Sequence, residues 1–348
     1  MASEAGDEPD RLEGFPHPRE AAALVGHVEA QAAIVEGMRA GRLHHAWLIG
    51  GPEGIGKATF AYQVAKCLLG NPGRVPQQLV ADPLAQASRL VSNLAHPDLV
   101  VLRRQPSTEK KGPTTQIPVD TVRRALNVFA STASGGGWRV CVVDSADDLN
   151  ASGANALLKV IEEPPPRAIF LIVAHQPGRV LPTIRSRCRK LMLRPLADPD
   201  LRTVLAGLPL PETRVDIEQV LKLADGSVRR ALTRLDPDTS ALIAGTTALL
   251  GSLPDYSIKT ALGMAEKLAG RAGEADFAVF LEAVEDWVSL TVRQNASGGA
   301  RRLAPIAEVW DKLLHSIREA DALNLDRRPV VMSIFEDLAD AVMRMRAA

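Results

Sequence analysis

The sequence predicts an α/β domain with a parallel sheet, followed by an all-helical region. Short runs of apolar and β-branched residues alternate with segments of helical periodicity as far as Pro195, which is the pattern of parallel strands joined by crossover helices. A glycine-rich loop separates the first of these strands from the helix that follows it. After Pro195 the apolar residues recur only at helical spacing.

The individual elements follow from the spacing of apolar residues. Strands are predicted at the consecutive apolar runs, over residues 45–49, 98–102, 139–143, 168–173 and 190–193. Helices are predicted where apolar residues return every three or four positions, over residues 19–39, 57–69, 119–130 and 150–163, the last ended by three prolines. Short helices over 201–206, 215–223 and 227–235 precede long amphipathic helices from residue 240 onward. The polar segment 105–116 and the glycine run 134–137 predict an exposed loop and a flexible connection.

The composition is that of a soluble globular protein with more than one domain. Hydrophobic residues make up 46% of the 348 residues, and charged residues make up 24%. The 41 basic and 41 acidic residues balance, so any contact with DNA must be local or shared with partners. The three cysteines show no paired spacing, and the acidic N-terminus has no apolar core of a signal peptide. We therefore expect a cytoplasmic protein with reduced thiols and no membrane contact.

The loop that follows the first predicted strand has the residues of a phosphate-binding loop. Residues 51–57 read G-P-E-G-I-G-K, which supplies Gly51, Gly54, Gly56 and Lys57 in the order strand, loop, helix. Glycines let successive backbone N–H groups approach phosphate oxygens, the helix N-terminus adds positive potential, and the lysine reaches the outer phosphates. We therefore predict nucleotide binding at this loop.

Two groups that hydrolysis requires are replaced. The residue after the lysine normally offers a hydroxyl to Mg²⁺, but here it is Ala58, and Thr59 stands one place later, about 100° around the helix. Asp144 ends an apolar strand as a metal-orienting aspartate should, yet Ser145 occupies the position of the catalytic carboxylate. Asp147 is the nearest carboxylate that could replace it. The motif therefore predicts binding with poor hydrolytic chemistry.

Four motifs together resemble the clamp-loader ATPases of bacterial DNA polymerase III. They follow in the order and spacing of that family: residues 50–57, 143–147, the helix segment 155–159 with its E-E-P-P end at 162–165, and Ser186-Arg187-Cys188. The resemblance implies an AAA+ fold. It places the ATPase-like domain at residues 15–194, a small helical lid at 195–238 and a helical collar for oligomerisation at 239–348. Residues 1–14 are predicted to be disordered because they offer little to bury.

The same resemblance suggests roles for three side chains. Arg187 would be an arginine finger that enters the ATP site of an adjacent motor subunit, a task that suits a planar, permanently charged guanidinium. The alternative for Arg187 is a structural salt bridge beside the last strand. Arg229 resembles the second sensor of the lid, which points toward the nucleotide or braces the lid against the core. His175 follows a strand where relatives carry a sensor of the γ-phosphate, and an ordinary exposed histidine is the alternative.

The resemblance also suggests partners and a cofactor. Clamp-loader motor subunits (gamma/tau) and a delta subunit would complete a five-subunit ring, which acts on a sliding clamp and on primed DNA. ATP or ADP would be bound without efficient hydrolysis. Relatives often carry a four-cysteine zinc module, but only Cys67 lies in that region and His96 is too distant, so no zinc is expected. The basic pair Arg123-Arg124 is the candidate for contact with the duplex backbone.

Three functions therefore compete. The favoured one is a non-hydrolysing clamp-loader subunit that contributes Arg187 to a neighbour. The first alternative is an active ATP-hydrolysing motor of the gamma/tau type, which Ala58 and Ser145 disfavour. The second alternative is a passive scaffold with a vestigial nucleotide loop. It differs from the favoured function only in whether Arg187 contributes to ATP turnover.

Overall fold

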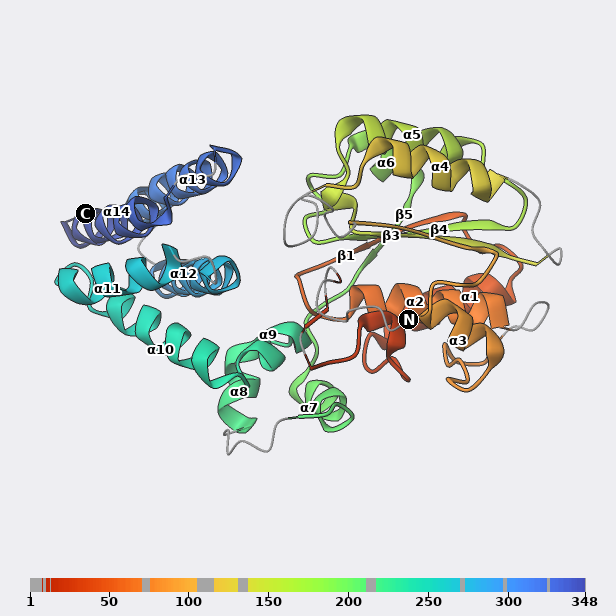
Figure 1. The fold of residues 1–348 in the computed structure, drawn as a ribbon, viewed down its shortest axis with the longest axis horizontal. Coiled ribbons are helices and arrows are strands. Elements are labelled where there is room, and N and C mark those ends of the chain that lie inside the picture. The colour runs from red at the N-terminus through yellow and green to blue at the C-terminus, as the bar shows by residue number, and fades with distance from the viewer. Residues whose placement is uncertain are drawn as a thin grey trace. The chain divides into compact units, whose positions relative to one another are not determined.

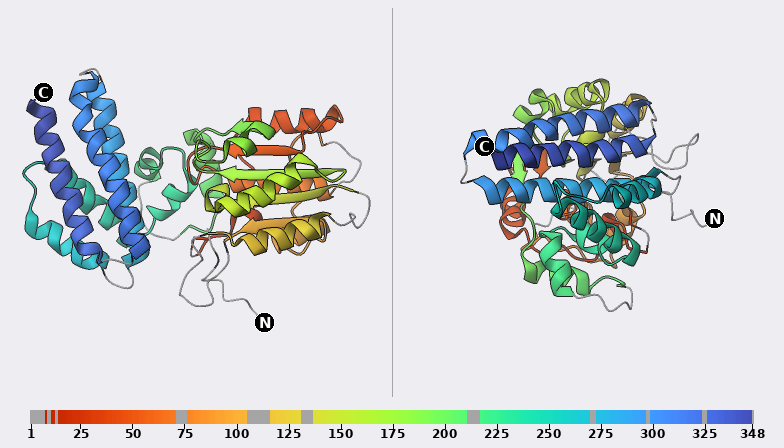
Figure 2. Two further views of the ribbon diagram at one scale, coloured as in Figure 1. Left: turned by 90° about the horizontal axis from the view of Figure 1, so that it is seen from above. Right: turned by 90° about the vertical axis from the view of Figure 1, so that its left-hand side faces the viewer.

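The computed structural model describes residues 8, 11–12, 14–70, 76–104, 116–130, 137–210, 217–269, 273–296, 299–323 and 326–347. The chain forms two compact units, Met1–Thr233 and Arg234–Ala348 (Figures 1 and 2). The first unit contains the sheet and the short helices that follow it. The second unit is entirely helical in its described part.

The first unit is built on a five-stranded parallel sheet in the order β2-β3-β4-β1-β5. The strands are β1 (Ala46–Gly50), β2 (Leu99–Arg103), β3 (Arg139–Asp144), β4 (Ala168–Ala174) and β5 (Arg189–Met192). Every residue of β1, β3 and β4 is buried, because helices cover both faces of the sheet. The parallel sheet with helices on both faces that the sequence predicts is thereby confirmed.

Helices cover the two faces of the sheet in two layers (Figure 1). One face carries α1 (Val28–Arg39), α2 (Lys57–Gly70) and α3 (Gln86–Ser92), and the other carries α4 (Val119–Ala130), α5 (Ala151–Glu162) and α6 (Pro182–Arg187). Alternate residues along the strands face the two layers. In β1, Trp47 and Ile49 belong to the core beneath α1 and α2, while Leu48 belongs to the core beneath α4 and α5.

The prediction of one helix over residues 19–39 is wrong for residues 19–27. A short 3-10 helix covers Pro18–Glu20, and α1 begins only at Val28. Gly26 (φ 74°) and His27 (φ 53°) lie in the left-handed region, which no α-helix tolerates in its interior. The segments 105–115 and 131–136, which contain most of the predicted loop and glycine run, lie outside the described residues.

Three short helices complete the first unit: α7 (Asp198–Ala206), α8 (Ile217–Ala224) and α9 (Val228–Thr233). They occupy the positions that the sequence predicts. Gly226, which precedes α9, has a positive φ of 71°, and its carbonyl accepts a hydrogen bond from the Leu196 N–H at 3.0 Å. A Cβ at Gly226 would lie 2.5 Å from the Leu196 carbonyl oxygen, so this close approach requires glycine.

The second unit consists of α10 (Pro237–Gly251), α11 (Ile258–Ala269), α12 (Gly273–Asn295), α13 (Ala300–Leu323) and α14 (Arg327–Ala347). Its core is centred on Phe280 and Phe335, whose ring centroids are 5.8 Å apart. Val284, Val288 and Leu313 are buried in this core, as their spacing indicates. None of the described helices is long and apolar enough to cross a bilayer.

Most of the predicted disordered segment, residues 1–14, lies outside the described part of the chain. Of its described members, Glu8 has a defined position, because its carboxylate pairs with Arg19 at 2.8 Å and with Arg103 at 2.7 Å. These two guanidinium groups, together with hydrogen bonds from them, lower the pKa of Glu8 to about 2 against the opposing effect of burial.

His17 is a buried histidine that must stay neutral in the folded protein. It is 1% exposed, and its Nδ1 accepts a hydrogen bond from the Arg19 N–H at 3.2 Å. Burial, and secondarily the charge of Arg19, lower its pKa to about 3. In the unfolded chain the pKa of His17 is near 6.5. Between pH 6.5 and pH 3 the unfolded state is therefore protonated at His17, whereas the folded state is not.

This difference predicts acid destabilisation of the first unit. The free energy of unfolding should fall as the pH drops from about 6.5 toward 3, by about 4 kcal/mol in all from His17. Urea titrations at several pH values would measure the slope. His17→Asn keeps an acceptor for the Arg19 N–H but cannot gain a proton, so its slope above pH 4.5 should be flatter. An equal slope in both proteins would show that His17 is not the responsible group.

Candidate functional site

The phosphate loop connects the end of β1 to the start of α2, as the motif predicts. Gly51, Gly54 and Gly56 adopt positive φ values of 144°, 76° and 98°. A Cβ at Gly51 would lie 2.6 Å from the Leu193 carbonyl oxygen, and one at Gly54 would lie 2.3 Å from the Ser227 hydroxyl. Glycine is therefore required here both for the backbone conformation and for close packing.

The carbonyl groups of the loop are held by donors from three elements. The donors are Lys57 Nζ on Pro52 O (2.5 Å), Ser227 Oγ on Glu53 O (3.0 Å), Val228 N on Gly54 O (2.9 Å) and His27 Nε2 on Ile55 O (2.8 Å). They come from the first residue of α2, from the start of α9 and from the residue before α1. The loop conformation is thus fixed by the protein itself.

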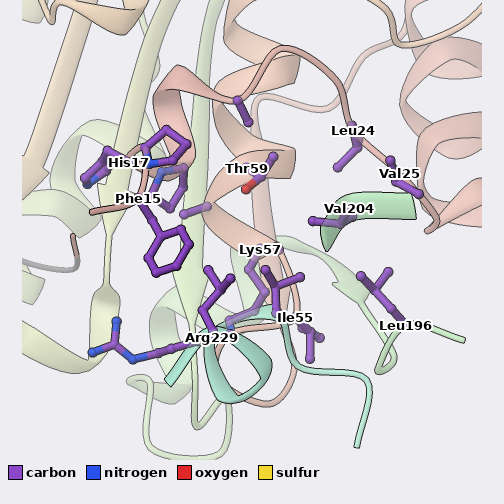
Figure 3. Close-up of a pocket in the computed structure, with 18 of the residues that line it drawn as sticks. Phe15, His17, Leu24, Val25, Ile55, Lys57, Thr59, Leu196, Val204 and Arg229 are labelled. Atoms are coloured by element: carbon purple, nitrogen blue, oxygen red, sulfur yellow. The ribbon is translucent and has the colours of Figure 1, made fainter. Parts of the chain in front are cut away.

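A cavity of about 210 Å³ lies against this loop. Figure 3 shows Phe15 and His17 on one side, Leu24, Val25 and Val204 on the other, and Lys57 and Thr59 between them. Asp144, at the end of β3, also lines it. The cavity therefore has apolar walls and a polar end at the loop, which suits a ligand with a flat apolar part and an anionic part.

Lys57 is buried at this polar end. It is 3% exposed, and burial lowers its pKa to about 8, although Glu53, Asp147 and Asp144 act in the opposite direction. Its ammonium group turns back onto the Pro52 carbonyl. A buried, charged lysine without a bound anion destabilises the folded state.

Replacing this lysine should stabilise the protein. Lys57→Met keeps the apolar stem and removes the charge, so the free energy of unfolding at pH 7 should rise by about 2 kcal/mol. Because the pKa is about 8 in the folded state and 10.5 in the unfolded one, this gain should shrink as the pH rises from 8 to 10.5. The exposed Lys259→Met is the control and should change stability by less than about 0.5 kcal/mol. Destabilisation by Lys57→Met would contradict this account.

The catalytic positions lack the groups that hydrolysis needs. Ala58 has no hydroxyl, and Ser145 is buried with its Oγ 3.4 Å from Asp148. The two carboxylate oxygens of Asp147 accept hydrogen bonds from the backbone N–H groups of His175 (2.7 Å) and Gln176 (2.9 Å). Asp147 therefore holds the segment after β4, and this engagement argues against its use as a replacement base.

The thiols are poorly suited to act as nucleophiles or metal ligands. Cys67, Cys141 and Cys188 are free and buried, and burial raises their pKa values to about 11, 12 and 12. Across the part of the chain that the structure describes, no three His, Cys, Asp or Glu side chains gather as metal ligands would.

Arg187, the last residue of α6, lies on the surface. Its Nη2 is 2.8 Å from the Glu162 carboxylate at the end of α5, and its Nη1 donates to the Thr183 carbonyl at 3.1 Å. Both side chains of the ion pair are 41% exposed. Arg187 is absent from the described residues that line the chain's own cavity.

Arg229 and the loop residue Glu53 form an ion pair that the sequence did not suggest. Nε of Arg229 lies 3.4 Å from Oε1 of Glu53, and both residues line the cavity. Sequence reasoning also missed His27, Ser227 and the segment around Phe15. The one available signal was the adjacency of Gly226 and Ser227 to Arg229.

A second hollow of about 450 Å³ lies between α4 and α5. Its polar lining comes from Arg123, Asn127, Ser152, Asn155 and Lys159. The Arg123 side chain is 63% exposed, with Asp120 at 3.7 Å as its nearby carboxylate. Exposed cations and amides of this kind can contact phosphate groups.

Comparisons with known proteins agree with the motifs. Residues 26–197 match the family described as DNA polymerase III, delta subunit. The chain is 37% identical over 184 residues to DNA polymerase III subunit delta' of Pseudomonas aeruginosa (53% of each chain). It is 34% identical over 216 residues to subunit delta' of Yersinia pestis (59% of this chain, 60% of the relative). It is also 28% identical over 289 residues to subunit tau of Escherichia coli (79% and 42%).

The chain spans about half the length of the curated relatives it matches. Among solved structures, a DNA polymerase III gamma subunit-related protein of Thermotoga maritima is 16% identical, with a TM-score of 0.43 over 88% of this chain and 99% of that one. The family match covers the phosphate loop, the strand that ends at Asp144 and the Ser186-Arg187-Cys188 segment. These matches support membership of the delta-prime and clamp-loader family of DNA polymerase III subunits.

Proposed function

We propose that this chain is a clamp-loader subunit of the delta-prime type, which lends Arg187 to the ATP site of a neighbouring motor subunit and hydrolyses little ATP itself. Its partners would be gamma/tau motor subunits and a delta subunit in a five-subunit ring. That assembly would open a sliding clamp and close it on primed DNA. The relatives whose names include delta', gamma and tau support this assignment.

The observation that carries the proposal is the position of Arg187. Its guanidinium is exposed, lies outside the chain's own cavity, and contacts the Glu162 carboxylate, the Thr183 carbonyl and the Ser186 hydroxyl. An exposed Arg–Glu pair contributes about 0–1 kcal/mol to stability. Little free energy is therefore lost when Arg187 leaves Glu162 and binds another anion. A guanidinium in this position can reach a phosphate on another subunit.

The composition of the chain's own site supports the second half of the proposal. It retains a glycine loop, a lysine and Asp144, the groups expected to hold ATP or ADP. It has Ala58 where Mg²⁺ needs a hydroxyl and Ser145 where the attacking water needs a base. Nucleotide would therefore be bound with slow hydrolysis.

Measurement of phosphate release tests this function. Three samples are compared on primed DNA: the motor subunits with delta, this chain alone, and the complete mixture. We expect the mixture to exceed the sum of the other two, while this chain alone stays at background. Steady turnover by this chain alone would support the motor alternative. A rate of phosphate release in the mixture equal to the sum of the other two would show that this chain does not stimulate the motor subunits.

The hollow between α4 and α5 is the place where we expect phosphate contact with primed DNA. Changing both Arg123 and Lys159 to Ala in the assembled complex should weaken binding across all sequences. Each lost phosphate contact should reduce the slope of log K against log salt concentration by about 0.9. Arg202→Ala, an exposed arginine on α7, is the control. An unchanged slope in the double variant would exclude contact at this hollow.

A further inference from the structure

Glu53 places a carboxylate near two cationic side chains, Lys57 of the phosphate loop and Arg229 of α9. Its Oε1 is 3.4 Å from Nε of Arg229. Among the charges that raise the pKa of Lys57 against the effect of burial, that of Glu53 is the largest. Glu53, Lys57 and Arg229 all line the cavity. An acidic side chain thus stands where the phosphates of a nucleotide are expected.

The backbone fixes Glu53 in this position. Its carbonyl accepts from Ser227 Oγ at 3.0 Å, and the carbonyl of the next residue, Gly54, accepts from the Val228 N–H at 2.9 Å. The loop therefore contacts the start of α9 directly. The ion pair between Glu53 and Arg229 joins the same two segments at their exposed side, since the two side chains are 55% and 36% exposed.

The charges at this end of the cavity disfavour an anion. Two cations, Lys57 and Arg229, lie near three carboxylates. Glu53 pairs with Arg229, and Asp144 and Asp147, like Glu53, raise the pKa of Lys57. An arriving polyphosphate is repelled by Glu53 and competes with it for Arg229. Of the three carboxylates, Glu53 is the one that pairs with the lid arginine.

We propose that Glu53 is an internal counter-ion of Arg229 that the phosphates of a nucleotide must displace, and that it thereby lowers the affinity of this site for ATP and ADP. The proposal rests on the nucleotide-binding function proposed above for the cavity. It adds a residue that determines affinity, and it explains how the lid can stay attached to the loop without a ligand.

Isothermal titration of the full chain with MgATP and with MgADP tests the proposal. Glu53→Gln should bind both nucleotides five- to tenfold more tightly than the unaltered protein, which corresponds to about 1.0–1.4 kcal/mol. Glu36→Gln, the same charge change at an exposed position of α1, should have no effect. In a chain that already carries Arg229→Gln, the gain from Glu53→Gln should fall below about twofold, because the paired cation is gone.

Other outcomes separate this inference from the function on which it rests. If the unaltered chain binds nucleotide and Glu53→Gln binds no better, the counter-ion proposal fails and the binding function stands. If the gain is equally large without Arg229, Glu53 acts by repulsion alone and the proposal again fails. If neither protein binds nucleotide at millimolar concentration, both the binding function and the counter-ion proposal are overturned.

Discussion

Arg187→Ala is expected to lower phosphate release at one interface of the assembled clamp loader by about 10²–10³-fold, while the altered chain still assembles. An arginine that stabilises charge on the transferring phosphate contributes on this scale, because its guanidinium acts in a site from which water is excluded. In the isolated chain the same residue makes an exposed ion pair with Glu162 and hydrogen bonds to Thr183 and Ser186 of its own helix. The change should therefore leave the melting temperature nearly unaltered.

Matched variants distinguish an arginine finger from an arginine with a purely structural role at position 187. Arg202 forms an equally short exposed ion pair with Glu218, at 2.7 Å, so Arg202→Ala removes the same chemistry elsewhere on the surface and should leave turnover unchanged. Arg187→Lys keeps the charge but loses the planar fork, and it should restore little activity. Glu162→Gln frees Arg187 and should preserve activity. Full activity of Arg187→Ala in a pre-steady-state phosphate-release assay would assign the residue to the surface ion pair alone.

Gly226→Ala should lower the free energy of unfolding of the first unit by about 3–4 kcal/mol. The φ of 71° is unfavourable for alanine by about 1–2 kcal/mol. The new Cβ would lie 2.5 Å and 2.6 Å from the carbonyl oxygen and nitrogen of Leu196, and backbone atoms cannot turn aside as a side chain can. Separation of these two segments would also break the hydrogen bond between Leu196 and Gly226.

Gly263→Ala provides the control for this prediction. Gly263 lies within α11, and a Cβ there would meet no atom within 4 Å. Alanine should therefore stabilise that helix by up to about 1 kcal/mol. Scanning calorimetry of the two variants would show opposite shifts. A Gly226→Ala protein as stable as the unaltered chain would show that the segment before α9 is not held against Leu196.

The strands were predictable because a sheet covered on both faces needs continuous apolar runs, as in residues 168–173 and 139–143. The phosphate loop was predictable because its glycines serve a local backbone geometry. The start of α1 was not, since the left-handed residues Gly26 and His27 interrupt an otherwise helical pattern. Local periodicity gives no sign of such a break in the helix.

The partners of the loop could not be predicted for a different reason. Glu53 and Arg229 are far apart in the sequence, and their pairing depends on the packing of the start of α9 against the phosphate loop. The same holds for His27 on the Ile55 carbonyl and for Phe15 in the cavity wall. A motif specifies the residues that a ligand needs, whereas these contacts depend on how the chain packs around the site.

Phosphate release by complete clamp loaders that carry one of two changes in this chain tests the central claim most directly. The account predicts that Arg187→Ala sharply reduces DNA-dependent turnover, whereas Lys57→Ala, in the chain's own nucleotide loop, leaves it nearly intact. The opposite pattern, with turnover lost on changing Lys57 and retained on changing Arg187, would mean that the chain consumes ATP at its own site and does not assist a neighbour.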